Sequence, residues 1–223
     1  MKDYYLKRAL EYEQIYRRED PIRLKEQEKV AHKMKRLLKD KEVIEIAAGT
    51  GYWTQFLSET ASRIEITDDV METLELAKTK KYKCLVEFRK EDAYGLSFND
   101  NTFSGGMANF WFSHIPREKT SDFFNGFHRV LKEDAIVFMA DNNFDATVGG
   151  ELIKPTGDIN TYKMRKLSDG TGHKILKNYF SKKELFTIFN KFSDNFSDKN
   201  IFYGEKFWYV YYTLNKSKAL STK

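Results

Sequence analysis

The sequence of 223 residues has one cysteine, Cys84, three prolines and no long apolar run. A lone thiol excludes an intramolecular disulfide and any metal site made of several thiolates. No His, Cys and Asp grouping has the spacing of a metal site, so we expect no metal. No window approaches the ~18 consecutive apolar residues of a membrane span, and the N-terminus lacks the apolar core of a signal peptide. These absences favour a cytoplasmic protein that does not contact a membrane.

No segment of the sequence forms a dedicated basic stripe, although the formal net charge is +5. Residues 1–42 carry 13 basic and 9 acidic side chains, residues 43–173 carry 15 and 20, and residues 174–223 carry 10 and 4. The positive charge therefore lies at the two ends of the chain, on either side of an acidic centre. This distribution makes nucleic acid an unlikely partner. The aromatic content of 15% is high and favours a closed pocket that contains little water.

Strands alternate with helices from residue 42 to residue 143, a pattern that predicts a mostly parallel sheet with helices on both faces. The expected strands are residues 42–47, 63–67, 85–90, 103–110 and 135–140. The expected helices are residues 53–61, 71–80 and 120–131. Residues 1–40 are expected to be mostly helical, with one face rich in tyrosine and a break at Pro21. The fold class is therefore α/β and Rossmann-like.

The pattern becomes less regular after residue 144. We expect strands at residues 161–167 and 207–213 and a helix over residues 181–192, capped by Ser181. The length leaves room for one domain with an elaboration. The predicted organisation is N-terminal helices over residues 1–42, a ligand-binding core over residues 43–143, and a small cap insertion with closing strands over residues 144–223.

The strongest motif is Val43–Thr54, a short β-branched strand followed by the glycine-rich turn Ala48-Gly49-Thr50-Gly51. In an open parallel sheet, ligands bind beyond the carboxyl ends of the strands, where glycines let a cofactor approach the backbone. A NAD-binding turn needs glycine where this chain has Ala47 and Tyr52. The turn is therefore too crowded for a diphosphate and suits a ligand without one.

The segment EIAAGTGYWT resembles the first motif of the class I S-adenosylmethionine-dependent methyltransferases. Asp68 matches the family position that holds the ribose hydroxyls, and Asp92-Ala93 matches the pair beside the adenine amino group. FSGGMANFWFSH resembles the fourth strand and its loop, although the family's usual Pro-Gly-Gly turn is replaced by Lys132-Glu133-Asp134. The resemblance covers residues 43–143. It implies methyl transfer from S-adenosylmethionine, with S-adenosylhomocysteine as the product.

The resemblance also implies roles for individual residues. Cofactor contacts are expected from Tyr12, Glu45, Ala47, Gly49, Gly51, Trp53, Asp68, Asp92, Ala93 and Asn109. Glu45 would face the methionine amino group, and Tyr12 on the N-terminal helix would form a lid or would only dock that helix on the sheet. Asp69 is an alternative to Asp68, and Trp53 is alternatively a core residue.

The catalytic candidates are His114, just after the fourth strand, and Asp141, at the end of the fifth. A histidine with an ordinary pKa of about 6.5 suits a base that removes a proton from the acceptor; His114 alternatively caps the next helix. Trp111, Asn142, Arg165, His173 and Lys177 are the expected substrate residues. If the cap residues among them face inward, they suit an anionic or hydrogen-bonding acceptor, and otherwise they belong to a solvated ribbon.

These features favour a monomeric or homodimeric enzyme that methylates a nitrogen or oxygen of a small molecule. One alternative is an RNA or protein methyltransferase that uses the basic ends for docking. The Asn/Asp-Pro-Pro-Tyr/Phe motif that the family uses for exocyclic amines of bases is absent, because the chain has Asn109-Phe110-Trp111-Phe112 there. Another alternative is a non-catalytic module that binds the cofactor.

Overall fold

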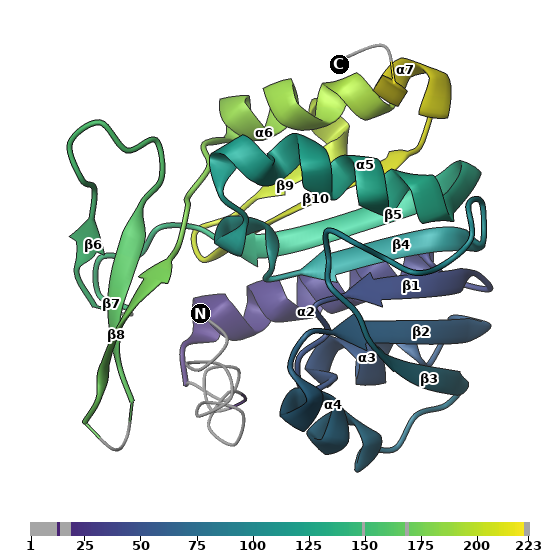
Figure 1. Cartoon of the computed structure of the whole chain (residues 1–223), viewed down its shortest axis with the longest axis horizontal. Coiled ribbons are helices and arrows are strands. Elements are labelled where there is room, and N and C mark those ends of the chain that lie inside the picture. The colour runs from purple at the N-terminus through teal and green to yellow at the C-terminus, as the bar shows by residue number, and fades with distance from the viewer. Residues whose placement is uncertain (1–12, 14–18, 149, 168–169, 221–223) are drawn as a thin grey trace.

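A seven-stranded sheet forms the centre of the computed structural model, which describes residues 13, 19–148, 150–167 and 170–220 (Figure 1). The strand order is β3-β2-β1-β4-β5-β10-β9. Strands β1 to β5 are parallel, and β10 runs antiparallel to both β5 and β9. The bounds are β1 Glu42–Ile46, β2 Arg63–Asp68, β3 Leu85–Lys90, β4 Phe103–Asn109, β5 Leu131–Asn142, β9 Ile201–Tyr203 and β10 Phe207–Thr213.

Helices cover both faces of this sheet, which confirms the predicted Rossmann-like α/β fold. The helices α2 (Pro21–Leu37), α3 (Tyr52–Leu57) and α4 (Met71–Lys78) pack on one face through one cluster of buried residues. The helices α5 (Thr120–Val130) and α6 (Lys182–Phe189) pack on the other through a second cluster. Shorter elements are η2 Phe112–His114, η3 Arg117–Lys119, η4 Asn190–Phe192, η5 Asp198–Asn200 and α7 Lys216–Leu220.

Helix boundaries follow local sequence signals. Asp20 caps α2 by accepting hydrogen bonds from the backbone of Ile22 and Arg23, and Pro21 occupies the first turn. Ser181 begins α6 with a capping box that it shares with Glu184, as predicted. These caps satisfy backbone N–H groups that have no partner within a helix.

A separate three-stranded antiparallel sheet, the cap sheet, lies beside the carboxyl ends of the parallel strands (Figure 1, left). Its strands are β6 (Leu152–Ile153), β7 (Tyr162–Lys166) and β8 (Gly172–Leu176). The sequence predicted only one strand in this region and also missed β9 and α7. These elements are two to five residues long, and β8 mixes polar with apolar residues, so neither length nor periodicity marked them.

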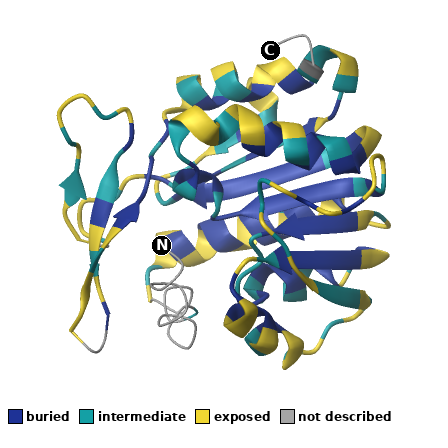
Figure 2. Cartoon of the chain, in the orientation of Figure 1, coloured by how far each residue is buried: buried dark blue, intermediate teal, exposed yellow. Residues whose placement is uncertain are grey.

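Burial is greatest in the central strands and in the helix faces that cover them (Figure 2). Phe123, Phe127 and Trp208 are fully buried, so part of the high aromatic content serves the core. Gly106 on β4 permits this packing, because a Cβ there would lie 2.7 Å from the ring of Phe127. Within the described residues, no helix has the length and hydropathy needed to cross a membrane.

Candidate active site

A cavity of about 300 Å³ opens at the carboxyl ends of β1, β2, β3 and β4. Its volume is at the lower end of the range typical of small-molecule pockets. It is lined by Ile46, Ala47, Gly49, Thr67, Asp68, Asp69, Val70, Thr73, Glu91, Asp92, Ala93, Tyr94, Phe110, Trp111 and His114. The wall thus unites the glycine turn with three later segments, in agreement with the rule that open sheets bind ligands at this edge.

The turn after β1 has left-handed backbone at Ala47, Gly49 and Gly51, with φ of 53°, 57° and 73°. Ala47 and Gly49 line the cavity, as predicted. Gly51 does not; a Cβ there would lie 2.5 Å from the Tyr82 hydroxyl and 3.2 Å from the Ala77 Cβ. The second glycine is therefore required by packing against the end of α4, and the first keeps the cavity wall open.

Four carboxylates form an acidic wall of the cavity: Asp68, Asp69, Glu91 and Asp92. Asp68 accepts hydrogen bonds from Gly49 N (2.8 Å), Val70 N (2.9 Å) and Thr73 Oγ1 (3.1 Å). Burial raises the pKa of Asp68 above its usual value. Asp68 therefore fixes the glycine turn against α4, while Asp69 is the more exposed of the two at the cavity wall.

Asp92 and Ala93 also line the cavity. Asp92 is exposed, and its Oδ1 accepts a hydrogen bond from Tyr94 N at 2.9 Å, which shapes the turn after β3. Tyr94 and Phe110 line the cavity without having been predicted. Tyr94 follows the Asp92-Ala93 pair directly, so the same turn that marked the pair could have indicated it.

Glu45 lies beneath the glycine turn and is only 2% exposed. Its Oε2 accepts a hydrogen bond from Thr54 Oγ1 at 2.6 Å. Burial raises the pKa of Glu45 to about 8. This effect of burial is larger than the lowering effects of the Thr54 hydrogen bond and of the Lys80 charge. The side chain is therefore largely protonated at neutral pH when no cation lies beside it.

Besides Gly51, three predicted cofactor contacts do not line the cavity: Glu45, Trp53 and Asn109. Trp53 is 4% exposed and stacks on Phe110, with ring centroids 5.3 Å apart. Asn109 is buried, and its Nδ2 points to the sulfur atoms of Met34 and Met107 at 3.5 and 3.3 Å. Trp53 packs from α3 on Phe110, and Asn109 faces α2, so the two side chains support the cavity wall from behind. Tyr12 lies outside the described residues.

His114 ends η2 and lines the cavity next to Trp111. Its Nδ1 lies 2.8 Å from the carbonyl oxygen of Leu176 on β8. A carbonyl only accepts, so Nδ1 carries the proton and Nε2 carries the lone pair. Burial, reinforced by the positive charge of Lys177, lowers the pKa of His114 well below its usual value. The imidazole is therefore neutral at physiological pH.

Asp141 and Lys177 form a buried ion pair, and neither lines the cavity. Lys177 Nζ lies 3.0 Å from Asp141 Oδ1 and donates to Ser113 Oγ at 2.6 Å. Asp141 also accepts from Ser113 N and from both nitrogens of Asn142. Asp141, predicted to be catalytic, and Asn142 and Lys177, predicted to contact substrate, do not line the described cavity, because Asp141 binds the other two side chains and Ser113.

The inward face of the cap sheet is basic. Alternation along β7 and β8 places Lys163, Arg165 and His173 on the same face, since Arg165 pairs with His173. Arg165 acts electrostatically on His114 and on Tyr179, which places its charge near the cavity. Lys163 was not predicted; it is 1% exposed and donates to the carbonyls of Val148 and Gly150. Lys163 and Arg165 are two residues apart in a predicted strand, so the sequence could have indicated that they share a face.

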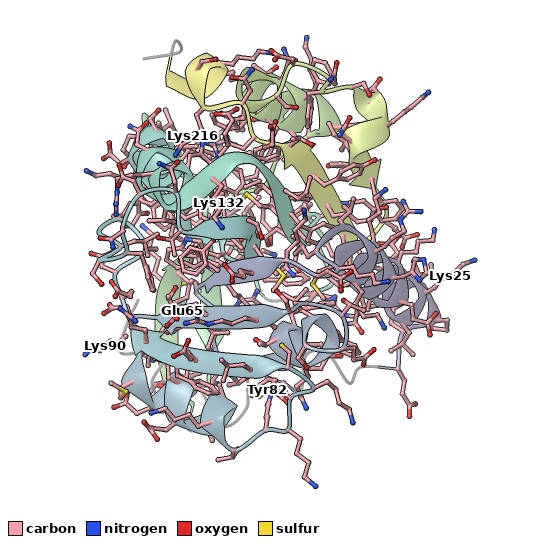
Figure 3. All side chains as sticks on the ribbon, turned by 90° about the vertical axis from the view of Figure 1, so that its right-hand side faces the viewer. Lys25, Glu65, Tyr82, Lys90, Lys132 and Lys216 are labelled. Atoms are coloured by element: carbon pink, nitrogen blue, oxygen red, sulfur yellow. The ribbon has the colours of Figure 1, made fainter. Side chains whose placement is uncertain are left out.

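A second hollow, of about 180 Å³, lies at the amino-terminal ends of β1, β2 and β4. Glu65, labelled in Figure 3, is buried there and pairs with Arg89 at 3.3 Å and with Arg63 at 3.8 Å. Its charge is thus balanced within the protein, and we assign this hollow a structural role. The described residues contain no group of three His, Cys, Asp or Glu side chains arranged to hold a metal ion.

Comparison with known proteins agrees with this geometry. Residues 43–134 match the family model of the methyltransferase domain. The DhpI–SAH complex superposes with a TM-score of 0.72 at 23% identity, covering 94% of this chain and 92% of that one. The DhpI–SAM–HEP complex gives 0.72 at 22%, covering 94% of each chain. PH0226 from Pyrococcus horikoshii OT3 gives 0.68 at 17%, covering 92% and 99%. No curated protein matches the chain significantly.

The match of residues 43–134 to the methyltransferase domain, together with the shared fold of the DhpI complexes, supports a class I S-adenosylmethionine-dependent methyltransferase with S-adenosylmethionine as its cofactor. The cavity fits that cofactor chemically. Its acidic wall suits a ligand that carries a sulfonium and an ammonium group, and Ala47, Gly49 and Ala93 leave room for it. The strand ends β1 to β4 therefore supply the cofactor half of the site.

Proposed function

We propose that this enzyme methylates a nitrogen or oxygen atom of a small-molecule acceptor, and that the acceptor carries negative charge or hydrogen-bonding groups. The observation that carries this proposal is a difference in charge between the cavity and the neighbouring cap sheet, whose basic residues do not themselves line the cavity. Four carboxylates line the cofactor side, whereas Lys163, Arg165 and His173 share the inward face of the cap sheet. A site of this kind attracts a cationic donor to one side and an anionic acceptor to the other.

On the cofactor side, Asp68 or Asp69 would hold the ribose hydroxyls and Asp92 would accept from the adenine amino group. Glu45 would accept from the methionine ammonium, for which it must first lose its proton. When bound, the cofactor supplies a methyl group that its sulfonium has already activated. The protein's remaining work is to align the acceptor and to exclude water.

On the acceptor side, Trp111 offers a polar atom that needs a partner. Its Nε1 is buried at the cavity and has no hydrogen-bond partner within the described part of the chain. An unsatisfied buried donor costs about 1–3 kcal/mol, which an acceptor oxygen bound there would recover. Arg165 would then bind a charged group of the same molecule, because its planar guanidinium suits carboxylates and phosphate-like groups.

His114 would act as the base, although burial lowers its pKa in the free protein and so makes it a weaker base than the ordinary histidine that the sequence predicted. The acceptor's N–H or O–H proton would pass to Nε2 as the acceptor's lone pair forms the new bond to carbon and the carbon–sulfur pair stays on sulfur. The Leu176 carbonyl keeps Nδ1 protonated, so the lone pair is on the correct nitrogen. A neutral imidazole also avoids repulsion with the sulfonium.

The first test is calorimetry with S-adenosylmethionine, followed by a screen of acceptors in matched pairs that differ only in an anionic group. We expect the anionic member of a pair to be the better substrate. Arg165→Gln should raise its KM about tenfold without changing cofactor affinity, the loss of about one charge-assisted hydrogen bond. Lys166→Gln, on the exposed neighbouring residue, is the control and should leave KM unchanged.

Two results would contradict this proposal. Equal activity on neutral and anionic acceptors would remove the charge argument. Methylation of RNA or protein, with binding that weakens steeply as salt increases, would indicate docking on the basic ends of the chain instead.

A further inference from the structure

The turn that carries His114 is tied to three consecutive residues of the cap, Leu176, Lys177 and Asn178. His114 Nδ1 donates to Leu176 O at 2.8 Å. Lys177 Nζ donates to Ser113 Oγ at 2.6 Å, and Asn178 N donates to Ser113 O at 2.8 Å. The sequence separation is more than 60 residues, so the position of this turn depends on a segment that is distant in the sequence.

Asn178 occupies the centre of this connection and is fully buried. Its Nδ2 donates to Ile115 O and to Asn160 Oδ1, both at 3.0 Å, and its Oδ1 accepts from Thr161 N at 2.9 Å. One side chain therefore joins the His114 turn to Asn160 and Thr161, the two residues that precede β7. Asn160 Oδ1 in turn accepts from Arg117 N at 2.8 Å, which extends the network to η3.

We infer that Asn178 is a positioning residue that holds the Phe112–His114 turn against the cap and so fixes which ring nitrogen of His114 carries the proton. This role of Asn178 rests on the proposed function of His114 as a base. If the turn shifts away from β8, Nδ1 loses the Leu176 carbonyl, and the proton can move to either nitrogen. Only the tautomer with the proton on Nδ1 leaves the lone pair on Nε2.

The surroundings of the turn make this dependence strong. Asp141 accepts from Ser113 N at 2.8 Å from the β5 side, while Lys177 holds Ser113 Oγ from the cap side. These contacts fix Ser113, whereas Leu176 O and the Asn178 amide hold the two residues that follow it, His114 and Ile115. Removal of the amide should thus loosen the His114 end of the turn first.

The test is nitrogen-15 NMR of the histidine rings, with cofactor bound. The chain has only four histidines, and a His114→Gln variant assigns the signal. We expect wild-type His114 to show a proton on Nδ1, and Asn178→Ala to show a mixture of both tautomers. His128 is an internal reference, because it is buried in α5 with Tyr212 and should not change.

Asn143→Ala is the matched control for general loss of stability. Asn143 is also buried, and its Nδ2 donates to Gly204 O and Phe207 O at the β9–β10 turn. With an identified acceptor, we expect Asn178→Ala to lower kcat about tenfold or more, part of the about 10²–10⁴-fold that a positioned base contributes. Asn143→Ala should leave kcat of the folded enzyme unchanged. If Asn178→Ala does not fold, Asn178→Ser is measured in its place.

An unchanged His114 tautomer in the Asn178 variant would overturn the inference, as would a proton on Nε2 in the wild type. The NMR result does not require turnover. If no acceptor is methylated but the tautomer depends on Asn178, the proposed function fails and the positioning role stands. If His114→Gln retains full kcat while the tautomer still depends on Asn178, His114 is not the base.

Discussion

The two halves of the site differ in charge, in topology and in how far apart their residues lie in the sequence. The cofactor half is acidic and is built from residues that directly follow parallel strands. The cap half is basic and is built from an antiparallel sheet that joins the His114 turn across more than 60 residues. A methyl donor that is a cation and an acceptor that carries negative charge would each meet the half that attracts it.

Because of this difference, the two halves should respond differently to the loss of a single side chain. Each cofactor contact comes from its own strand end, so the loss of one should weaken binding and leave the others in place. The cap contacts form one network through Ser113, Asp141, Lys177 and Asn178. Because these groups hydrogen-bond to one another, removing one side chain also weakens the contacts of the others, so the free-energy costs of separate mutations in the network should not add.

The largest effect is expected from Asp141→Ala. This change leaves Lys177 buried without its anion and removes the acceptor of Ser113 N. Breaking a buried pair by removing one partner costs about 3–5 kcal/mol, so the free energy of unfolding in urea should fall by about that amount. The paired replacement Asp141→Leu with Lys177→Met should cost less than Asp141→Ala. If it costs more, the ion pair is not what makes Asp141 important.

Asp92→Ala should test the cofactor half alone. If Asp92 accepts from the adenine amino group as proposed, its loss should weaken cofactor binding by about tenfold or more, measured by calorimetry. The free energy of unfolding should change little, because Asp92 is exposed. Asp100→Ala removes another exposed carboxylate, one that pairs with Arg129 outside the cavity, and should leave affinity unchanged. Unchanged affinity in the Asp92 variant would remove the adenine assignment.

Glu45 should make cofactor affinity depend on pH. Its pKa of about 8 in the free protein means that it is protonated below that pH, and only the carboxylate can accept from an ammonium group. Binding therefore releases a proton, and affinity should rise by up to tenfold from pH 6 to pH 7, where an α-amino group is still charged. Titrations at both pH values measure this, and Glu45→Gln should abolish it. A flat wild-type profile would place Glu45 outside the contact shell of the cofactor.

The same contrast explains what the sequence could reveal. Strand ends in a parallel sheet meet at one edge, so the strand pattern predicted Ala47, Gly49, Asp68, Asp92 and His114 near that edge, and the family resemblance implied that they share one cavity there. Helix and strand patterns gave most bounds of the main sheet within a few residues, although β5 starts at Leu131, four residues earlier than expected.

The cap could not be predicted in this way. Whether the Lys177 side chain reaches the methyl acceptor or pairs with Asp141 depends on how distant segments pack together. The local periodicity of the sequence carries no information about that packing. Trp53 and Asn109 show a related difficulty. Each lies close to a strand end at the cavity, but the direction of its side chain determines whether the residue lines the cavity or packs in the core. Burial by α2, a helix distant in sequence from both, settled that choice.

The smallest expected effect belongs to the outward face of the cap. Lys174 lies over the Tyr162 ring at 4.2 Å, on the side of β8 opposite to His173 and Lys177. Lys174→Ala should lower the free energy of unfolding by only about 0.5–1 kcal/mol, the value of an exposed cation–π contact. It removes one positive charge from the cap, as Arg165→Gln does, yet it should leave the KM for the acceptor unchanged. A rise in KM equal to that of Arg165→Gln would mean that the cap attracts the acceptor through its total charge and not through its inward face.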